Sequence, residues 1–316
     1  SLLGVAINEG NYSFPVGKLN FMQMFPDKFK EYLRSADNAL YNQLLDFVGN
    51  TDSIPSILFN RIEEFYLSYQ ICGGLPLSAR SMIDNIGLEN VEKILEENLM
   101  AYEMDFSKHS LHSDIPKIHA IWNSTPEQLS RENNKFVYRV VREGARAREY
   151  ENALQWLVDA GMLYRVKLCE KPELPLSFYE NNTAFKVYLL DIGLLRKLSK
   201  LPAEIFISST NLFTEFKGAL AENFVLTSLL AQGFDIPNYW TLQGSKAEVD
   251  FLIANKLAVI PIEVKSDRRI SGKSFAEYDK KYNPSLRIRL SMNNIKKDGN
   301  LLNLPIFMAD WIKEYV

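Results

Sequence analysis

The sequence has few of the residues that build disulfide frameworks or zinc sites. Its 316 residues include only two cysteines, Cys72 and Cys169, and three histidines. Two cysteines so far apart make neither a disulfide framework nor a zinc motif, which fits a reducing cytoplasm. The histidines, at 109, 112 and 119, have no cysteine or suitably spaced carboxylate beside them. We therefore expect surface or capping histidines and a cytoplasmic location.

The chain also lacks the long apolar runs of a membrane protein. No apolar run approaches the roughly 18 residues that a membrane span requires. The first residues, SLLGVAINEG, contain neither the basic segment nor the cleavage site of a signal peptide. We expect no membrane partner. The formal net charge is −3, so any contact with nucleic acid would depend on a local basic patch.

A complete phosphate-binding loop is missing as well. Residues 15–18 are PVGK, but the loop requires G-x-x-x-x-G-K followed by Ser or Thr, and Leu19 follows Lys18. We predict a strand after a turn at this point instead.

The chain has no initiator methionine, and SLLGVAI has the pattern of a buried strand already under way. We therefore expect this sequence to be a fragment of a longer protein.

The composition is that of a globular protein, with 47% hydrophobic and 12% aromatic residues. Hydrophobic periodicity predicts a mixed α/β fold. We expect a first region over residues 1–85, in which Gly73-Gly74 ends a helix. A helical region should follow over 86–200, and an α/β domain over 201–316, beginning with a long helix from 214 to Gly233.

Within the middle region, residues 136–170 predict a winged helix-turn-helix. The apolar positions Ala153, Trp156, Leu157 and Ala160 recur at helical spacing, Gly161 ends the helix, and an apolar strand follows. This arrangement is often used to place a helix in the major groove of DNA. We expect the helix before the second helix to carry four arginines: Arg139, Arg142, Arg146 and Arg148. They could contact phosphates, or they could form a solvated face on a module that only docks domains together.

The stretch AEVDFLIANKLAVIPIEVKS, residues 247–266, predicts two antiparallel strands. A two-residue loop at 255–256 would set Asp250 opposite Pro261. Period-two alternation places four charged side chains on one face: Glu248, Asp250, Glu263 and Lys265. Asp250 and Glu263 would then be diagonal neighbours, roughly 5–8 Å apart at Cβ, and could share one divalent cation. The alternative is the solvated polar face of an ordinary hairpin.

The order of these residues resembles a known superfamily. Glu222, Asp250 and the run Glu263-Val264-Lys265 resemble the PD-(D/E)XK restriction-endonuclease-like superfamily, although Val249 replaces the leading proline. More broadly, the segments KGALAENFVLTSL, AEVDFLI, IPIEVKS, LNLPIF and YQICGGLP resemble bacterial and archaeal AAA-type ATPases whose C-terminal half is a domain of unknown function. The resemblance covers nearly the whole chain. It implies that residues 1–85 are the end of an ATPase domain with a helical lid, and that the ATP-binding motifs precede residue 1.

The resemblance also implies a role for each residue of the motif. Asp250, Glu263 and the main-chain carbonyl of Val264 would hold Mg²⁺ or Mn²⁺. The ion would polarise the scissile phosphate and lower the pKa of an attacking water. Lys265 would orient that water or offset charge in the transition state. Glu222 would complete the acid cluster, directly or through water.

Two functions remain open at this stage. One is a metal-dependent nuclease coupled to ATP hydrolysis; the other is the same fold binding DNA or a protein partner without cutting it. Residues 265–297 are rich in lysine and arginine, so they could contact phosphates or form a solvated surface. The candidate nucleic-acid contacts are Arg268, Arg269, Lys273, Lys280 and Lys281. The sequence leaves the oligomeric state and the choice between DNA and RNA open.

Overall fold

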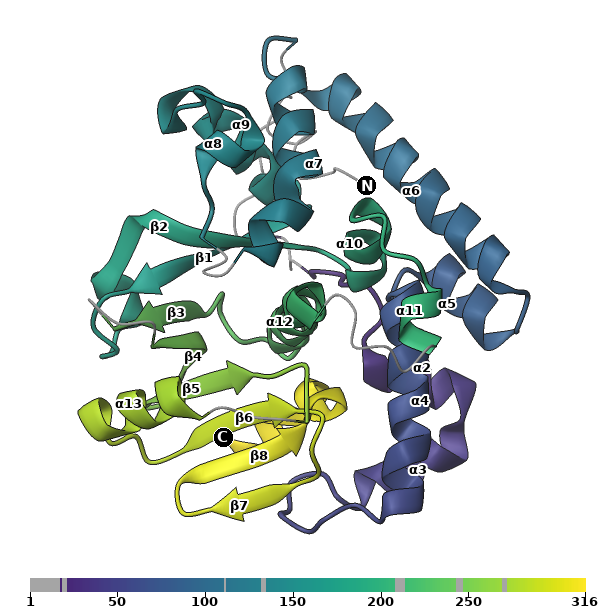
Figure 1. Ribbon diagram of the computed structural model, residues 1–316, viewed down its shortest axis with the longest axis vertical. Helices are drawn as coiled ribbons and strands as arrows, with labels where there is room; N and C mark the ends of the chain where they lie inside the picture. Colours follow the sequence, from purple (N-terminus) through teal and green to yellow (C-terminus); the bar gives the residue numbers. More distant parts are fainter. Residues whose placement is uncertain are drawn as a thin grey trace.

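The structure is a computed structural model that describes residues 18, 22–110, 112–131, 135–207, 214–242, 247–268 and 272–316. It confirms a mixed α/β protein. The N-terminal helices form an arc along one side of the molecule, and the strands lie on the other side (Figure 1). Among the described helices, none has the length and apolarity needed to cross a membrane.

The first part of the chain consists of helices in the described residues. They are α2 (Phe29–Ala36), α3 (Asn38–Leu45), α4 (Ser56–Cys72), α5 (Pro76–Ile83) and α6 (Leu88–His109). Helix α4 ends where predicted, because the next residue, Gly73, has a φ of +68°. Residues with a Cβ rarely adopt this backbone conformation. The strand expected at residues 15–18 lies almost wholly outside the described residues.

The middle of the chain contains the short helices and first strands that the sequence predicts around residues 136–170. The elements are α7 (Ile115–Ser130), α8 (Tyr138–Val141), α9 (Ala147–Asp159), β1 (Leu163–Cys169), η1 (Leu176–Tyr179), β2 (Glu180–Leu189), α10 (Ile192–Leu198) and α11 (Glu204–Ile207). Helix α9 buries Ala153 and Leu157 as its periodicity predicts, and Gly161 follows it with a φ of +71°. A helix, a turn, a second helix and a strand are therefore confirmed in that order.

The C-terminal part begins with the long helix that was predicted from residue 214. Its elements are α12 (Thr214–Ala231), β3 (Asn238–Thr241), β4 (Glu248–Asn255), β5 (Ala258–Val264), α13 (Lys273–Tyr282), β6 (Arg287–Ser291), β7 (Lys296–Asp298), β8 (Leu301–Pro305) and η2 (Ile306–Tyr315). Helix α12 ends just before Gly233, whose φ is +84°.

One eight-stranded sheet connects these segments, in the order β2-β1-β3-β4-β5-β6-β8-β7. Strand β1 pairs with β3 in parallel, so the sheet continues across the boundary predicted near residue 200. Helix α12 contacts β2 and β5, whereas α13 contacts β4. Phe275 and Tyr278 of α13 pack with Trp240 and Val249, in a cluster separate from the main core. Two strands of the middle segment therefore share one sheet with the predicted nuclease-like segment.

The register of the β4–β5 hairpin differs from the prediction. Asn255 pairs with Ala258, so the loop consists of residues 256–257 rather than 255–256. Lys256 supplies the positive φ, +52°, that tight hairpin loops require. Pro261 consequently pairs with Leu252, and the predicted pairing of Pro261 with Asp250 is wrong. If the observed register is continued by one residue beyond the pair Phe251–Ile262, Asp250 lies directly opposite Glu263. These two residues are therefore closer together than the diagonal neighbours expected from the sequence.

Candidate active site

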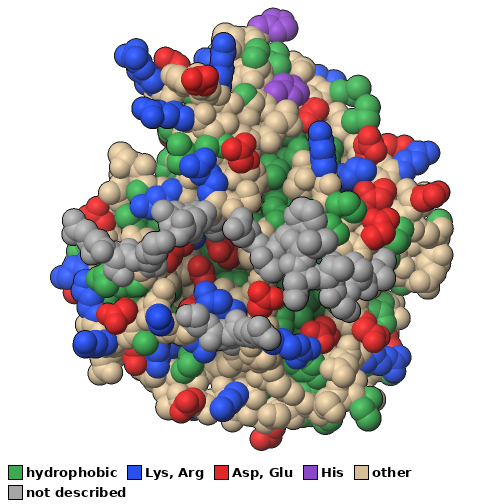
Figure 2. Space-filling view, in the orientation of Figure 1, with side chains coloured by type: hydrophobic (Ala, Val, Ile, Leu, Met, Phe, Trp, Pro, Cys, Tyr) green, Lys and Arg blue, Asp and Glu red, His purple; other side chains and the backbone are tan. Residues whose placement is uncertain are grey.

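Charged side chains gather where α12 lies against the ends of the central strands. We call them the charge cluster: Lys186 (β2), Glu222 (α12), Glu248 and Asp250 (β4), Glu263 (β5), Lys265 (directly after β5) and Arg289 (β6). Acidic and basic side chains also lie side by side in a hollow near the centre of the face in Figure 2. The cluster contains four acids and three bases, so its charges nearly balance.

Lys186 is fully buried among the acids. Its Nζ lies 2.5 Å from Oε1 of Glu248 and 3.5 Å from Oε2 of Glu222. Burial alone would lower the pKa of Lys186, but the carboxylate of Glu222, with those of Glu248 and Asp250, raises it well above its ordinary value. The Tyr188 hydroxyl donates a hydrogen bond to Glu222 Oε2 at 2.7 Å. Lys186 is therefore a buried permanent cation that holds two acids.

Asp250 lies on β4 and is 8% exposed. Its Oδ2 accepts a hydrogen bond from the main-chain N–H of Val264 at 2.7 Å. Burial, followed by the negative charge of Glu222, raises the pKa of Asp250 to about 7, although Lys265 and Lys186 oppose the shift. Asp250 can therefore gain or lose a proton near neutral pH, which an ordinary aspartate cannot do.

Glu263 is the most deeply buried acid of the predicted motif, at 1% exposure. Its Oε2 accepts a hydrogen bond from Arg289 Nε at 2.7 Å, and its Oε1 lies 3.4 Å from Lys265 Nζ. Oε1 has no hydrogen-bond donor among the described residues. One oxygen of this carboxylate is thus bound by a guanidinium, and the other has unused acceptor capacity.

Lys265 connects the acids of the predicted motif. Its side chain is 35% exposed. Burial would lower the pKa of Lys265, but Asp250 first, and then Glu263 and Glu222, raise it. The ammonium group therefore contacts Glu263 and interacts electrostatically with Asp250 and Glu222. The structure brings together the four residues predicted as catalytic: Glu222, Asp250, Glu263 and Lys265.

The chemistry of the donors suits magnesium or manganese, although protein cations already contact one of them, Glu263. Carboxylates of Asp250 and Glu263 and the carbonyl of Val264 are the oxygen ligands that these ions prefer, and Glu263 Oε1 has a free acceptor site. Among the described residues, however, no group of three or more His, Cys, Asp or Glu is arranged to hold a metal. An ion would therefore have to compete with Lys265 for Oε1 of Glu263.

The residues predicted to bind nucleic acid have mixed surroundings. Arg268 donates two hydrogen bonds of 2.7 Å to the carboxylate of Glu63 on α4, and its guanidinium lies 5.5 Å from the Phe59 ring. Arg269 lies outside the described residues. Three lysines of α13 are exposed, as a phosphate contact requires: Lys273, Lys280 and Lys281. Arg268 is thus bound to α4 rather than available to a phosphate.

Sequence reasoning missed Lys186 and Arg289, which complete the cluster. Lys186 is the one charge in the apolar run AFKVYLL, and Arg289 follows Arg287 by two residues in LRIRLSM. A charged side chain in a buried strand needs a partner. The same argument applied to every strand would have identified Lys186 and Arg289.

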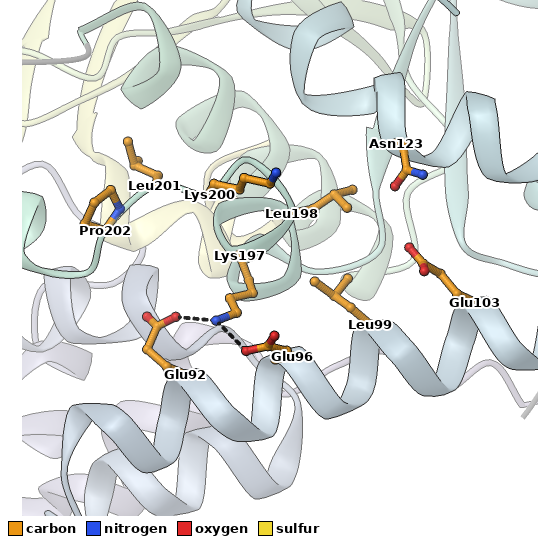
Figure 3. Close-up of a pocket in the computed structure, with 10 residues that line it drawn as sticks. All are labelled: Glu92, Glu96, Leu99, Glu103, Asn123, Lys197, Leu198, Lys200, Leu201 and Pro202. Carbon is orange, nitrogen blue, oxygen red and sulfur yellow. Dashed lines mark hydrogen bonds and ion pairs between the residues drawn. The ribbon is translucent and has the colours of Figure 1, made fainter.

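Two cavities of the structure differ in their position relative to the charge cluster. One, of 220 Å³, adjoins the charge cluster, since Ser266 and Asp267 follow Lys265 and Ala221 precedes Glu222. The other, of 690 Å³, lies between α6 and α10 (Figure 3). In the second cavity Lys197 Nζ binds Glu92 at 3.1 Å and Glu96 at 3.3 Å. The smaller cavity is thus lined by sequence neighbours of Lys265 and Glu222, and the larger one is not.

Two family models match parts of the chain. Residues 63–205 are similar to a domain of unknown function, DUF8612, and residues 217–307 to another, DUF4143. The first segment contributes Lys186, and the second contributes the rest of the charge cluster, so the cluster is built from both. Neither the curated proteins nor the solved structures compared with the chain include a match.

Proposed function

We propose that the charge cluster is the active site of a metal-dependent nuclease, which hydrolyses a phosphodiester bond in nucleic acid. The observation that carries the proposal is geometric: Lys265 Nζ lies 3.4 Å from Glu263 Oε1, and Asp250 Oδ2 accepts a hydrogen bond from the N–H of Val264, which stands between Glu263 and Lys265 in the chain. Three carboxylates from one helix and two adjacent strands, with one lysine among them, provide both metal ligands and a positive charge for a phosphate.

In this proposal each residue has a separate task. A bound Mg²⁺ or Mn²⁺ would supply Lewis-acid activation of the phosphate and of water. Asp250, Glu263 and the Val264 carbonyl would hold the ion, and Glu222 would hold it directly or through water. Lys265 would place its charge beside the phosphate. Because the pKa of Asp250 is about 7, the site would become competent for metal as the pH rises through neutrality, since ligand carboxylates must be ionised.

A second function is favoured by the cations that already contact the acids. Lys186 and Arg289 bind Glu222, Glu248 and Glu263 within the fold. If they neutralise the site permanently, the domain would bind nucleic acid or a protein without cleaving anything. The AAA-type ATPase relationship, the winged helix over residues 136–170 and the restriction-endonuclease-like fold all remain proposals alongside either function.

Calorimetry with MnCl₂ and MgCl₂ at pH 8 tests the proposal directly. We expect saturable binding to the unmodified chain, a large loss of affinity in Asp250→Asn, and cleavage of DNA or RNA that disappears in Lys265→Met. Lys93→Met is the matched control, because this lysine lies on α6 with a 72% exposed side chain. Absence of metal binding at millimolar concentration would refute the nuclease and leave the binding module.

A further inference from the structure

The exposed side of α9 carries side chains that can read DNA bases. Its other side packs into the core through Tyr150, Leu154 and Leu157. Arg148, Asn152 and Gln155 are exposed at spacings of four and three residues, so they follow one another along one face. Arginine pairs with guanine, and asparagine or glutamine with adenine, in the major groove. Gln155 also donates to Asp159 at 2.7 Å, at the far end of this face.

Further arginines lie beside this face. Arg139 and Arg142 of the α8 region and Arg146 directly before α9 are exposed. None of them forms an ion pair with another described residue. Between 135 and 149, five cations stand against two acids. The cations are Lys135, Arg139, Arg142, Arg146 and Arg148, and the acids are Glu143 and Glu149. Basic side chains gather over α8 and α9 in Figure 2.

The comparison with residues 265–297 favours this surface. There, three arginines are occupied by internal acids or amides: Arg268 by Glu63, Arg287 by Asp279 and Asn300, and Arg289 by Glu263. A guanidinium held by a carboxylate has few donors left for a phosphate. The arginines around α9 have all of their hydrogen-bond donors available. The basic surface better suited to phosphate contacts therefore lies in the middle of the chain rather than in residues 265–297.

Helix α9 is held firmly enough to present this surface. Glu151 accepts hydrogen bonds from Tyr138 of α8 at 2.6 Å and from Arg165 of β1 at 2.8 Å. The carboxylate thus joins the preceding helix, α9 and the following strand. Arg165 also lies 4.7 Å from the Phe185 ring on β2. With 13 residues, α9 is about 20 Å long, and the major groove of B-form DNA, about 12 Å wide, admits a helix.

We propose that α9 docks in the major groove of duplex DNA, with Arg148 and Asn152 facing base edges and Arg139, Arg142 and Arg146 contacting phosphates. This binding goes beyond the proposed nuclease function, because it needs neither the charge cluster nor a metal ion. Duplex RNA is a poor competitor in this proposal, since its deep, narrow major groove does not admit a helix.

Fluorescence anisotropy with labelled duplex DNA, in EDTA and over a series of salt concentrations, tests the proposal. We expect Arg142→Ala and Arg146→Ala each to weaken binding several-fold and to reduce the salt slope by about one. Asn152→Ala should retain general affinity but lose sequence preference in selection from a random duplex library. Lys93→Ala is the matched control, because this lysine is exposed on α6, away from α9 and from the predicted nucleic-acid contacts, and the variant should bind like the unmodified chain.

The outcomes separate this proposal from the proposed active site. Asp250→Asn should bind DNA normally in EDTA, so failure to bind metal or to cleave leaves the docking proposal standing. Binding that is unchanged in Arg142→Ala and Arg146→Ala, or that is lost equally in Lys93→Ala, would overturn it. Equal competition by duplex RNA would overturn the major-groove geometry. Unchanged circular dichroism of the variants shows that any loss is not unfolding.

Discussion

Lys186 on β2 binds Glu248 on β4 across the two strands that separate them in the sheet, with 2.5 Å between Nζ and Oε1. The ammonium group lies 5.2 Å from the Tyr239 ring on β3, one of the intervening strands. Three cations in the charge cluster face four acids. Among the described residues Asp250 forms no ion pair, and burial, followed by the negative charge of Glu222, raises its pKa to about 7.

Replacing Lys186 by methionine should destabilise the protein strongly. The substitution keeps the length of the side chain but leaves Glu222 and Glu248 without their buried cation. Breaking a buried ion pair by removing one partner typically costs about 3–5 kcal/mol. Urea denaturation should show this loss as a lower midpoint with an unchanged slope.

A matched substitution controls for the loss of a lysine on the same sheet. Lys167 on β1 binds Glu180 at 2.8 Å, but both side chains are partly exposed. Lys167→Met should therefore cost no more than about 1 kcal/mol. If the two variants lose equal stability, Lys186 is not the cation that holds the cluster. Partial recovery in the double variant Lys186→Met/Glu248→Gln would show that the loss arises from the unpaired acid.

The pKa of Asp250 predicts how stability depends on pH. The folded state keeps a proton on Asp250 up to about pH 7, whereas the ordinary value for the unfolded chain is 3.8. Folding therefore takes up a proton between these values, and this contribution to stability is present at low pH and lost as the pH rises toward 7. Each unit of pKa difference corresponds to about 1.4 kcal/mol.

Thermal unfolding of Asp250→Asn between pH 5 and 8 isolates this contribution. The variant carries no ionisable group at the position, so its advantage over the unmodified chain should grow as the pH rises to 7 and then level off. Asp298→Asn, at an exposed position on β7, should show no such trend. A constant difference between Asp250→Asn and the unmodified chain across this range would contradict the raised pKa.

Much of the architecture could be predicted from the sequence, because local signals specify it. Helix ends at Gly73, Gly161 and Gly233 follow from the positive φ that glycine accepts. The motif residues on α12, β4 and β5 were found from their order along the chain. The register of the β4–β5 hairpin could not be predicted in this way. Asn255-Lys256 and Lys256-Leu257 are both acceptable loops, and cross-strand packing decides between them.

The partners of the acids could not be predicted for a different reason. Lys186 reaches Glu248 only because β1 and β3 become neighbours, and that single pairing joins two segments of the chain. Nothing local at Lys186 indicates which sheet it enters. The partner of Arg268 could not be predicted from the local sequence either, because Glu63 lies 205 residues earlier in the chain. Long-range pairings of this kind decide which charges are free, and sequence composition alone does not contain them.

Gly74 provides a test of how the N-terminal helices join the rest of the protein. Its N–H donates to Asp191 Oδ2 at 2.7 Å, and its carbonyl accepts from the N–H of Asp27 at 2.7 Å. A Cβ at this position would overlap the Asp27 carbonyl. Gly74→Ala should therefore cost at least the roughly 1–3 kcal/mol of an overpacked core, measured by chemical denaturation.

Gly218 is the matched glycine for this comparison. It lies inside α12, and a Cβ there would meet nothing within 4 Å. Gly218→Ala should stabilise the protein by about 0.5–1 kcal/mol, because alanine favours the helix. Destabilisation by both substitutions to the same extent would refute the proposed role of close packing at Gly74.

Arg289 tests whether Glu263 is a metal ligand or only the buried partner of an arginine. Arg289→Met removes the guanidinium from a carboxylate that is 1% exposed, so the variant should lose about 3–5 kcal/mol without metal. If Glu263 can bind Mn²⁺, the ion should restore part of this stability, because a ligand that binds only the folded state stabilises it. The rise in melting temperature on adding Mn²⁺ should then be larger for Arg289→Met than for the unmodified chain.

Arg287→Met distinguishes this effect from a general response to the ion. Arg287 is on the same strand but binds Asp279 and Asn300, away from Glu263. Its loss should destabilise the protein without increasing the response to Mn²⁺. An equal response in both arginine variants would mean that Glu263 serves Arg289 alone, and the domain would then be better described as a metal-free binding module. A selective response in Arg289→Met would instead place the ion at Glu263, as the nuclease proposal requires.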